Sequence, residues 1–350
     1  MKNGASFCDH AQSLFTIHIY CRHRGIVSAS REMTEMSLKG RDFVNFQDFT
    51  RSEVDRIFDL TKRYVPVHLN GEKLDVARGK VLGTLFCEPS TRTKFAFETA
   101  MLRLGGDYIG WAGIEATSYK KGESFLDGMR QMDRFVDAIC LRHEENGAPA
   151  ATAEVCEHPV INCGDGTNQH PTQPLHEMYA IKEYKGRLKG VNVVFMGDLK
   201  NMRVAHSLAY GLAMYEANQT YVSPPELAMP SEIVNDMKKR YNAKISLMTP
   251  EEAMPQADVL YIVAMEIKRF IQGGLGEEGF KKFSKYYKVN MEALRRWRVK
   301  DELAVIHCLP RLGELDPDVD HSKYDKVFET YNYAVPAKMA LLALLLGVRK

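Results

Sequence analysis

Short apolar runs alternate with stretches of helical periodicity along most of the chain. In the first half, the apolar runs end in polar turns and are typical of buried strands, while the stretches between them carry apolar residues at helical spacing. The expected strands are VLGTLFC at 81–87, DYIGW at 107–111, DAICLR at 137–142 and PVINCGDG at 159–166. This alternation favours a parallel sheet with helices on both faces.

The alternation starts again after residue 185, and the length of 350 residues also favours two domains. We therefore expect an α/β protein with two doubly wound parallel-sheet domains linked by helices. The predicted first domain spans 37–185 and is completed by a C-terminal helix at 334–350, and the second domain spans 186–333. The further expected strands are VNVVFMGD at 191–198, QTYVSP at 219–224, AKISLM at 243–248, ADVLYIVA at 257–264 and ELAVIHCLP at 302–310.

Residues 1–36 do not share this pattern. The stretch FTIHIYCRH has alternating apolar character, but no long apolar region and no small-residue cleavage site accompany it, so a signal peptide is not indicated. We interpret the segment as a poorly ordered extension or an upstream start, because Met33 and Met36 stand just before the patterned sequence. A targeting element is the alternative interpretation.

Composition narrows the classes of function. The net charge is +2 with acids and bases interspersed, which argues against a nucleic-acid-binding face. The apolar run MALLALLLG at 339–347 is too short to cross a bilayer and is expected to be a buried helix. None of the seven cysteines forms a C-x-x-C pair, so neither a zinc site nor a redox dithiol is indicated. Free thiols suit a reducing cytoplasm, where we expect the protein to reside.

The segment EPSTRT at 88–93 lies where a strand ends and a helix begins. Backbone N–H groups in the first helical turn lack intrahelical partners there, and the helix dipole favours an anion. Ser90, Thr91 and Thr93 add hydroxyl donors, and Arg92 adds a fork that suits phosphate oxygens. An ordinary N-cap needs only one hydroxyl, so the segment favours a phosphate site. It is not a Walker A loop, because the glycine–lysine pattern is absent.

Further polar clusters follow other expected strands. TSYKKGES at 117–124 lies at the start of a helix expected near 122–135, and it is a solvated face unless it serves a site. Arg142 at a strand end is open to the same surface interpretation. GDGTNQHPTQP at 164–174 fixes His170 before a proline and beside Gln173. An imidazole N–H and an amide in a rigid turn suit the polarisation and orientation of a carbonyl group.

Two motifs belong to the second expected domain. GDLKNMR after the strand at 191–198 lacks the G-x-G-x-x-G fingerprint, so dinucleotide binding is disfavoured, whereas Arg203 at a helix start suits a carboxylate. HCLPR at 307–311 ends a strand with a Leu-Pro kink, and such a kink exposes carbonyl groups that accept from an amide NH₂. A purely structural turn is the alternative.

Taken in order from about residue 40 onwards, these segments resemble the aspartate/ornithine carbamoyltransferase superfamily. The aspartate branch is the nearer one, because RLGELDPDVD and GDLK follow its pattern, although HCLP is spelled as in the ornithine branch. The motifs that carry the resemblance are STRT, KKGE, RH, NQHPTQ, GDLK with Arg203, HCLPR and VPAKMALLALLLG.

The resemblance implies an enzyme that transfers the carbamoyl group of carbamoyl phosphate to an amine. It places His170 and Arg142 at the carbonyl oxygen, and Gln173 with the backbone of Leu309 and Pro310 at the carbamoyl NH₂. It also implies that the phosphate is held by Ser90, Thr91, Arg92 and Thr93.

The resemblance further implies residues supplied by a neighbour and by a domain closure. Lys121 matches a lysine that an adjacent subunit contributes, with Thr117 or Ser118 as its hydroxyl companion, so a homotrimer or a multiple of it is expected. Arg203 matches the arginine for the acceptor α-carboxylate, and Glu88 and Arg269 form with it an ion-pair set that favours a closed form.

The implied mechanism needs neither a metal nor a cofactor. An uncharged amine attacks the carbonyl carbon, and Arg92, Arg142 and His170 donate to the charge that develops on the oxygens. Domain closure expels water and aligns the reactants. The leaving phosphate can accept the proton of the amine.

The acceptor loop departs from the pattern of the aspartate branch. Where that pattern has an arginine and a glutamine, this chain has Ala264 and Glu266, and the ornithine pattern is also absent. A carboxylate at 266 repels the side-chain carboxylate of aspartate, by about 4 kcal/mol for like charges about 4 Å apart at an effective dielectric near 20.

Three hypotheses follow. The first is a carbamoyltransferase whose amino-acid-like acceptor is neither aspartate nor ornithine. The second is a divergent aspartate carbamoyltransferase, which makes N-carbamoyl-L-aspartate for pyrimidine biosynthesis and in which Lys268 or Arg269 replaces the missing arginine. The third is a catalytically silent partner with this fold, which the complete phosphate motif disfavours.

Overall fold

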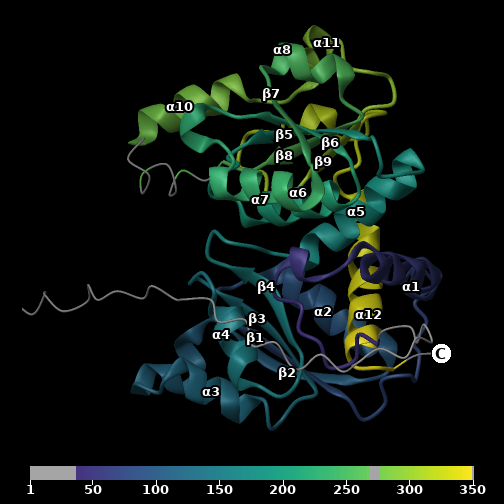
Figure 1. Cartoon of the computed structure of the whole chain (residues 1–350), viewed down its shortest axis with the longest axis vertical. Helices are drawn as coiled ribbons and strands as arrows, with labels where there is room; N and C mark the ends of the chain where they lie inside the picture. The colour runs from purple at the N-terminus through teal and green to yellow at the C-terminus, as the bar shows by residue number, and fades with distance from the viewer. Residues whose placement is uncertain (1–36, 266, 268–270, 272–275, 349–350) are drawn as a thin grey trace, which may run out of the picture. The chain divides into compact units, whose positions relative to one another are not determined.

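The computed structural model of the chain describes residues 37–348, apart from 266, 268–270 and 272–275 (Figure 1). The predicted extension at 1–36 therefore lies outside the described residues. The described chain begins its regular structure with α1 (Arg51–Leu69), whose first turn is closed by a capping box between Thr50 and Glu53.

The first sheet has four parallel strands in the order β2-β1-β3-β4. The central strands are β1 and β3, and β4 at one edge is also buried, because strands of a parallel sheet carry apolar side chains on both faces. The four strands are β1 (Val81–Phe86), β2 (Asp107–Ala112), β3 (Ala138–His143) and β4 (Val160–Asp165). The helices between and after them are α2 (Thr91–Leu104), α3 (Phe125–Met132), α4 (Ala148–Val155) and α5 (Thr172–Lys185).

The second sheet has five parallel strands in the order β7-β6-β5-β8-β9. Its strands are β5 (Asn192–Gly197), β6 (Asn218–Val222), β7 (Lys244–Leu247), β8 (Val259–Val263) and β9 (Ala304–His307). The described helices of this part are α6 (Arg203–Met214), α7 (Ser231–Tyr241), α8 (Pro250–Ala253), α10 (Gly276–Tyr286) and α11 (Met291–Arg296). Both sheets confirm the expected α/β class with parallel, helix-covered sheets.

The expected strands agree with the observed strands to within three residues at each end. One helix differs more: a helix was expected near 122–135, and α3 spans Phe125–Met132. Gly122 has a left-handed backbone with φ of 88° and closes a preceding 3-10 turn, so the helix begins only after Ser124. At the other end, the Asp133 carboxylate accepts from the backbone N–H of Glu157 and His158, which holds Asp133 in a turn.

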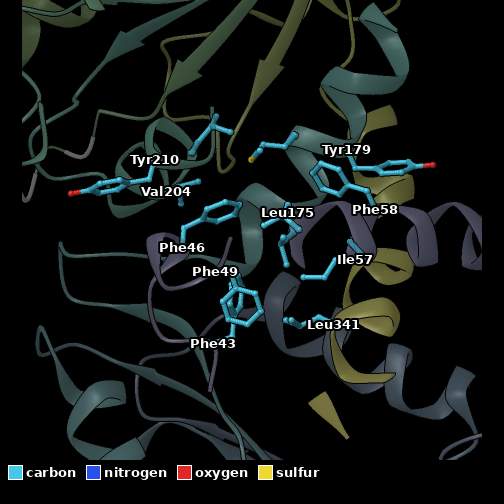
Figure 2. Close-up of a cluster of buried hydrophobic side chains, with 14 of the residues drawn as sticks. Phe43, Phe46, Phe49, Ile57, Phe58, Leu175, Tyr179, Val204, Tyr210 and Leu341 are labelled. Atoms are coloured by element: carbon cyan, nitrogen blue, oxygen red, sulfur yellow. The ribbon is translucent and has the colours of Figure 1, made fainter. Parts of the chain in front are cut away.

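The helix α12 (Ala334–Leu345) packs along α1 and α2, beside the first sheet (Figure 1). It is buried all round, because nearly every side chain from Ala334 to Leu345 belongs to a hydrophobic cluster shared with those helices. Figure 2 shows part of that cluster, where Phe43, Phe46 and Phe49 gather with Leu175 of α5 and Leu341 of α12. The division of the chain at residue 185 stays a prediction.

Candidate active site

The phosphate motif lies at the start of α2, directly after β1. Ser90 occupies the N-cap position in an extended conformation, but its side chain makes no capping bond to the helix backbone. Its hydroxyl instead donates to Thr93 Oγ1 at 3.2 Å. Thr91 and Arg92 are exposed. Thr91 and Arg92 are thus accessible to a ligand at a helix N-terminus, where an anion is favoured.

His170 lies beside this motif, in the turn that joins β4 to α5. Its ring is 2% exposed, with Nε2 3.3 Å from Thr93 Oγ1 and Nδ1 3.2 Å from Thr172 Oγ1. Its backbone N–H donates to Ser207 Oγ of α6 at 2.9 Å. Burial lowers the pKa of His170 well below its ordinary value, and the cations of Arg142 and Arg203 lower it further. The ring is therefore uncharged at neutral pH and able to donate one N–H.

A carboxylate links the two arginines of the site. Glu88, after β1, has Oε2 2.7 Å from Arg203 Nη2 and 3.1 Å from Arg142 Nε. The first contact is a hydrogen bond, whereas Arg142 Nε is not aligned for one. Burial, followed by the nearby Arg203 charge, lowers the pKa of Arg142 to about 10. Arg203 begins α6, so this ion pair joins the carboxyl ends of the two sheets.

Gly164 makes room for both guanidinium groups. It has a φ of 113°, and a Cβ built there would lie 2.9 Å from Arg203 Nε and 3.1 Å from Arg142 Nη1. Any side chain at this position would displace the two arginines and strain the backbone. The glycine is therefore part of what brings Arg142 and Arg203 together.

Gln173, in the first turn of α5, is held by two acceptors. Its Nε2 donates to Glu177 Oε1 at 2.9 Å and to the carbonyl of Cys308 at 3.2 Å. Because both amide hydrogens are used, Oε1 is the atom left to accept from a ligand. Glu177 also accepts from Tyr261 OH at 3.0 Å, and burial raises the pKa of this glutamate to about 7.

Leu309 and Pro310 follow β9 beside Gln173. The bond between them is cis, and Leu309 has a φ of 53°. The backbone N–H of Leu309 donates to His307 Nδ1 at 2.7 Å, and His307 Nε2 lies 2.5 Å from Glu314 Oε1. This bonded turn positions the carbonyl groups around residues 308–310 next to the predicted carbamoyl site.

Thr117, Ser118 and Lys121 lie apart from these residues. They occupy the loop between β2 and α3, where the Thr117 hydroxyl donates to the Ile114 carbonyl at 2.6 Å. Thr117 and Ser118 line a separate cavity of about 200 Å³ together with Trp111. Within the described part of the chain, no contact joins the three residues to Arg92 or His170. Their predicted role at a neighbouring subunit's site is untested.

The acceptor loop is described only in part. Ala264, directly after β8, is fully buried in a hydrophobic cluster and presents a methyl group there. Glu266 and Arg269, the other predicted residues of this loop, lie outside the described residues, as does Lys268. The roles proposed for them from sequence stay predictions.

A pocket at the inner side of the site includes residues that the sequence analysis missed. This α2–α12 pocket has a volume of about 20 Å³ and is lined by Arg92, Thr93, His170, Gln173, His176 and Lys338, among others. His176 comes from the buried part of α5, which ends at Ile181, and Lys338 comes from α12, a helix that is buried all round. A lone histidine and a lone lysine in otherwise core-like runs are the only sequence signals that could have pointed to them.

Stability should fall steeply in mild acid because several histidines are buried uncharged. Burial lowers the pKa values of His170, His176 and His206, so the unfolded chain binds more protons than the folded chain as pH drops through 6.5. Each histidine then contributes a slope of up to about 1.4 kcal/mol per pH unit to the free energy of unfolding. For His176→Leu, urea unfolding between pH 6 and 5 should show a slope smaller by about 1 kcal/mol per pH unit. An unchanged slope would contradict the uncharged state of His176.

The fold and the site together are those of a group-transfer enzyme for small polar substrates. The two domain models of one family match nearly the whole described chain: the aspartate/ornithine carbamoyltransferase carbamoyl-P binding domain over residues 41–183 and the Asp/Orn binding domain over residues 189–345. The chain belongs to the aspartate/ornithine carbamoyltransferase family and is a carbamoyltransferase, as its motifs predicted.

Relatives and solved structures are similar over nearly their full length. The aspartate carbamoyltransferase catalytic subunit of Thermococcus kodakarensis is 42% identical over 89% of this chain and 99% of its own. The catalytic subunit of M. jannaschii aspartate transcarbamoylase is 35% identical, with a TM-score of 0.79 over 88% of this chain and 98% of its own. The Trypanosoma cruzi enzyme in complex with carbamoyl phosphate and aspartate is 29% identical, with a TM-score of 0.82 over the same shares.

Within residues 37–348, apart from the gaps named above, no cluster of three histidine, cysteine or acidic side chains is arranged as metal ligands. None of the helices in that part of the chain combines the length and apolar character needed to span a bilayer.

Proposed function

We propose that this protein transfers the carbamoyl group of carbamoyl phosphate to the amino group of aspartate. The observation that carries the proposal is the cluster of Arg92, Thr93, His170 and Gln173 at the strand ends of the first sheet, beside the Arg142–Glu88–Arg203 ion pairs. The similarity to catalytic subunits named aspartate carbamoyltransferase supports the acceptor.

The first hypothesis from sequence, an acceptor that is neither aspartate nor ornithine, is therefore not the one proposed. The departure at Ala264 and Glu266 favoured an acceptor other than aspartate, but relatives at about 40% identity bear the aspartate name. A Trypanosoma cruzi relative has also been solved with both carbamoyl phosphate and aspartate. The divergent aspartate enzyme, which was the second hypothesis, is the better supported one.

The proposed chemistry follows from the protonation states and donors of the site. Arg92 and the α2 N-terminus bind the phosphate and stabilise the charge it gains on leaving. The uncharged His170 and the Arg142 cation donate to the carbonyl oxygen, while Gln173 Oε1 accepts from the carbamoyl NH₂. Because both Gln173 amide hydrogens are already used, the carbamoyl group has one preferred orientation in which the amine attacks its carbon.

Arg203 is the proposed partner of the acceptor α-carboxylate. It is almost fully buried. Its guanidinium forms an ion pair with Glu88 and donates a hydrogen bond to the Gly166 carbonyl. An arriving carboxylate must compete with Glu88 for this guanidinium, which couples acceptor binding to the contact between the two sheets. The side-chain carboxylate of aspartate is left to Lys268 or Arg269 in place of the arginine that Ala264 replaces.

A homotrimer or a multiple of it is the proposed assembly. Large apolar side chains are exposed on β2, on the adjacent α2 and just beyond β2, where the loop with Lys121 begins. Exposed apolar surface of this kind is typical of subunit interfaces. The side chains are Phe95, Leu102, Tyr108, Ile109 and Ile114. A cytoplasmic location stays part of the proposal and agrees with the free thiols of the described residues.

A product assay tests the acceptor. Purified protein should release phosphate from carbamoyl phosphate and form N-carbamoyl-L-aspartate when aspartate is supplied, with no comparable product from ornithine, asparagine or simple diamines. Turnover only with a cationic acceptor would contradict the aspartate proposal and restore the first hypothesis from sequence. If no acceptor in the panel led to phosphate release, both acceptor hypotheses would be contradicted.

A further inference from the structure

Lys338 is a buried lysine that forms no ion pair with the described residues. It lies on α12, its side chain is 3% exposed, and its Nζ donates to the Ala334 carbonyl of its own helix at 3.3 Å. The ammonium also lies 5.5 Å from the centre of the Phe97 ring. No carboxylate of the described residues lies within ion-pair distance of it. An unpaired buried charge is costly, so such a lysine is expected to gain a partner in some state of the protein.

The neighbours of Lys338 indicate what that partner is. The α2–α12 pocket brings it together with Arg92, Thr93 and His170, the proposed binding residues for carbamoyl phosphate. His176 lies in the same pocket, and neither of its ring nitrogens makes a hydrogen bond of ordinary geometry, although the Thr172 carbonyl lies near. The pocket has room for about one water-sized group between the buried cation and the site.

We propose that Lys338 is a further residue of the carbamoyl phosphate site, and that its ammonium group is the electrostatic counterpart of the bound phosphate dianion. The inference rests on the proposed function, because it takes the start of α2 as the phosphate site. It assigns a binding role to α12, a helix whose other side chains form core.

The protonation of Lys338 gives the inference a measurable signature. Burial lowers the pKa of Lys338 to about 8 in the free protein, so near pH 8 about half of the molecules carry a neutral amine there. A dianion in the pocket favours the ammonium form and raises that pKa. Binding therefore takes up to about half a proton per site at pH 8. The other groups around the lysine are Cys140, Cys163, His170, His176, Glu177, Tyr331 and Arg92.

Calorimetric titration with inorganic phosphate at pH 8 tests the inference. Titrations in buffers of different ionisation enthalpy report the number of protons taken up, and a comparison with Lys338→Met removes the contribution of the phosphate itself. Wild-type protein should take up more protons than Lys338→Met, and that variant should bind phosphate roughly tenfold more weakly. Lys338→Arg should keep most of the affinity without the proton uptake, because arginine stays charged.

Lys182→Met is the matched control. Lys182 lies 5.5 Å from the centre of the Phe58 ring, the same separation as Lys338 from Phe97, but it belongs to the outer part of α5. This variant should keep the wild-type affinity and proton uptake. Circular dichroism of Lys338→Met and Lys338→Arg checks that each variant is folded.

The outcomes separate the inference from the proposed function. Equal proton uptake and equal affinity in wild type and Lys338→Met would overturn the role of Lys338 while leaving the phosphate site intact. Absence of phosphate binding by wild-type protein that is folded would overturn the proposed site itself. Normal phosphate binding with the expected uptake, but without carbamoyl aspartate formation, would support Lys338 and overturn only the acceptor.

Discussion

Replacement of Arg92 by alanine should lower kcat/KM for carbamoyl phosphate by about a thousandfold, the scale seen when a donor aimed at developing charge is removed. Arg92 is the exposed cation at the start of α2, next to Thr93 and the uncharged His170. The remaining N–H and hydroxyl donors still bind an anion, but none of them offers a bidentate charged fork. The loss should therefore be larger in kcat than in the affinity for phosphate. Steady-state assays with saturating acceptor measure it.

Arg92 is exposed, so its removal should leave the fold intact. Arg78→Ala is a suitable control because Arg78 is also exposed and makes only a surface contact with Asp75 at 3.7 Å. It should retain full activity. Turnover by Arg92→Ala at the level of this control would contradict the proposal that the phosphate binds at the N-terminus of α2.

Mixing two inactive variants should restore activity if Lys121 serves the site of a neighbour. Lys121→Ala and Arg92→Ala should each be nearly inactive as homotrimers, because every site then lacks one cation. In a randomly mixed trimer, a site with its own Arg92 and a neighbour's Lys121 would arise about one time in four, because the interfaces of a cyclic trimer are head-to-tail around the ring. An equal mixture, dissociated and reassembled, should recover about a quarter of the wild-type activity.

The mixing experiment distinguishes a shared site from one complete within each chain. Recovery should require dissociation, so simply combining the two intact variants should give no activity. A reassembled mixture that stays inactive, while reassembled wild type regains full activity, would contradict the role of Lys121 in a neighbouring site. Sedimentation of the wild-type protein gives the number of subunits independently.

The fold was largely predictable because the strand signal is strong. Runs such as those at 81–87 and 259–263 are mostly apolar, and a parallel sheet buries both faces of such strands. The order of elements then left only a doubly wound arrangement. The sequence was less informative about α3. The left-handed turn at Gly122 delays the start of this helix, and the residues on either side of the glycine do not indicate that turn.

The site was predictable where residues follow strands and not where they lie in buried helices. Ser90, Arg92 and His170 stand at strand ends, so their meeting followed from the topology of a parallel sheet. Glu177 and Lys338 lie in helices whose periodicity gives no facing direction, because polar and apolar residues are mixed around α5 and α12 is apolar on nearly every side. Their contacts with Gln173 and with the α2–α12 pocket depend on how those helices pack, which no local pattern encodes.

The acceptor specificity was the least predictable feature. The loop after β8 departs from the aspartate pattern at Ala264 and Glu266, and these departures favoured another acceptor although the remainder of the domain follows the aspartate branch. Ala264 is buried in the core, so its methyl group has a packing role whichever acceptor binds. In the proposed function, specificity depends on which cation reaches the side-chain carboxylate of aspartate, and a single aligned position does not determine that.

The position of α12 has a consequence for the order of assembly during synthesis. The strands of the first sheet are all made by Asp165, but the helix that packs along α1 and α2 and carries Lys338 begins only at Ala334. At ordinary rates of translation, the roughly 170 intervening residues take on the order of ten to thirty seconds to emerge. During that time the α1 and α2 surfaces destined for α12 are uncovered, and a chaperone that binds apolar surface has its longest opportunity there. The described strands and helices of the second sheet are all made before α12, so this sheet can finish folding before the first sheet does.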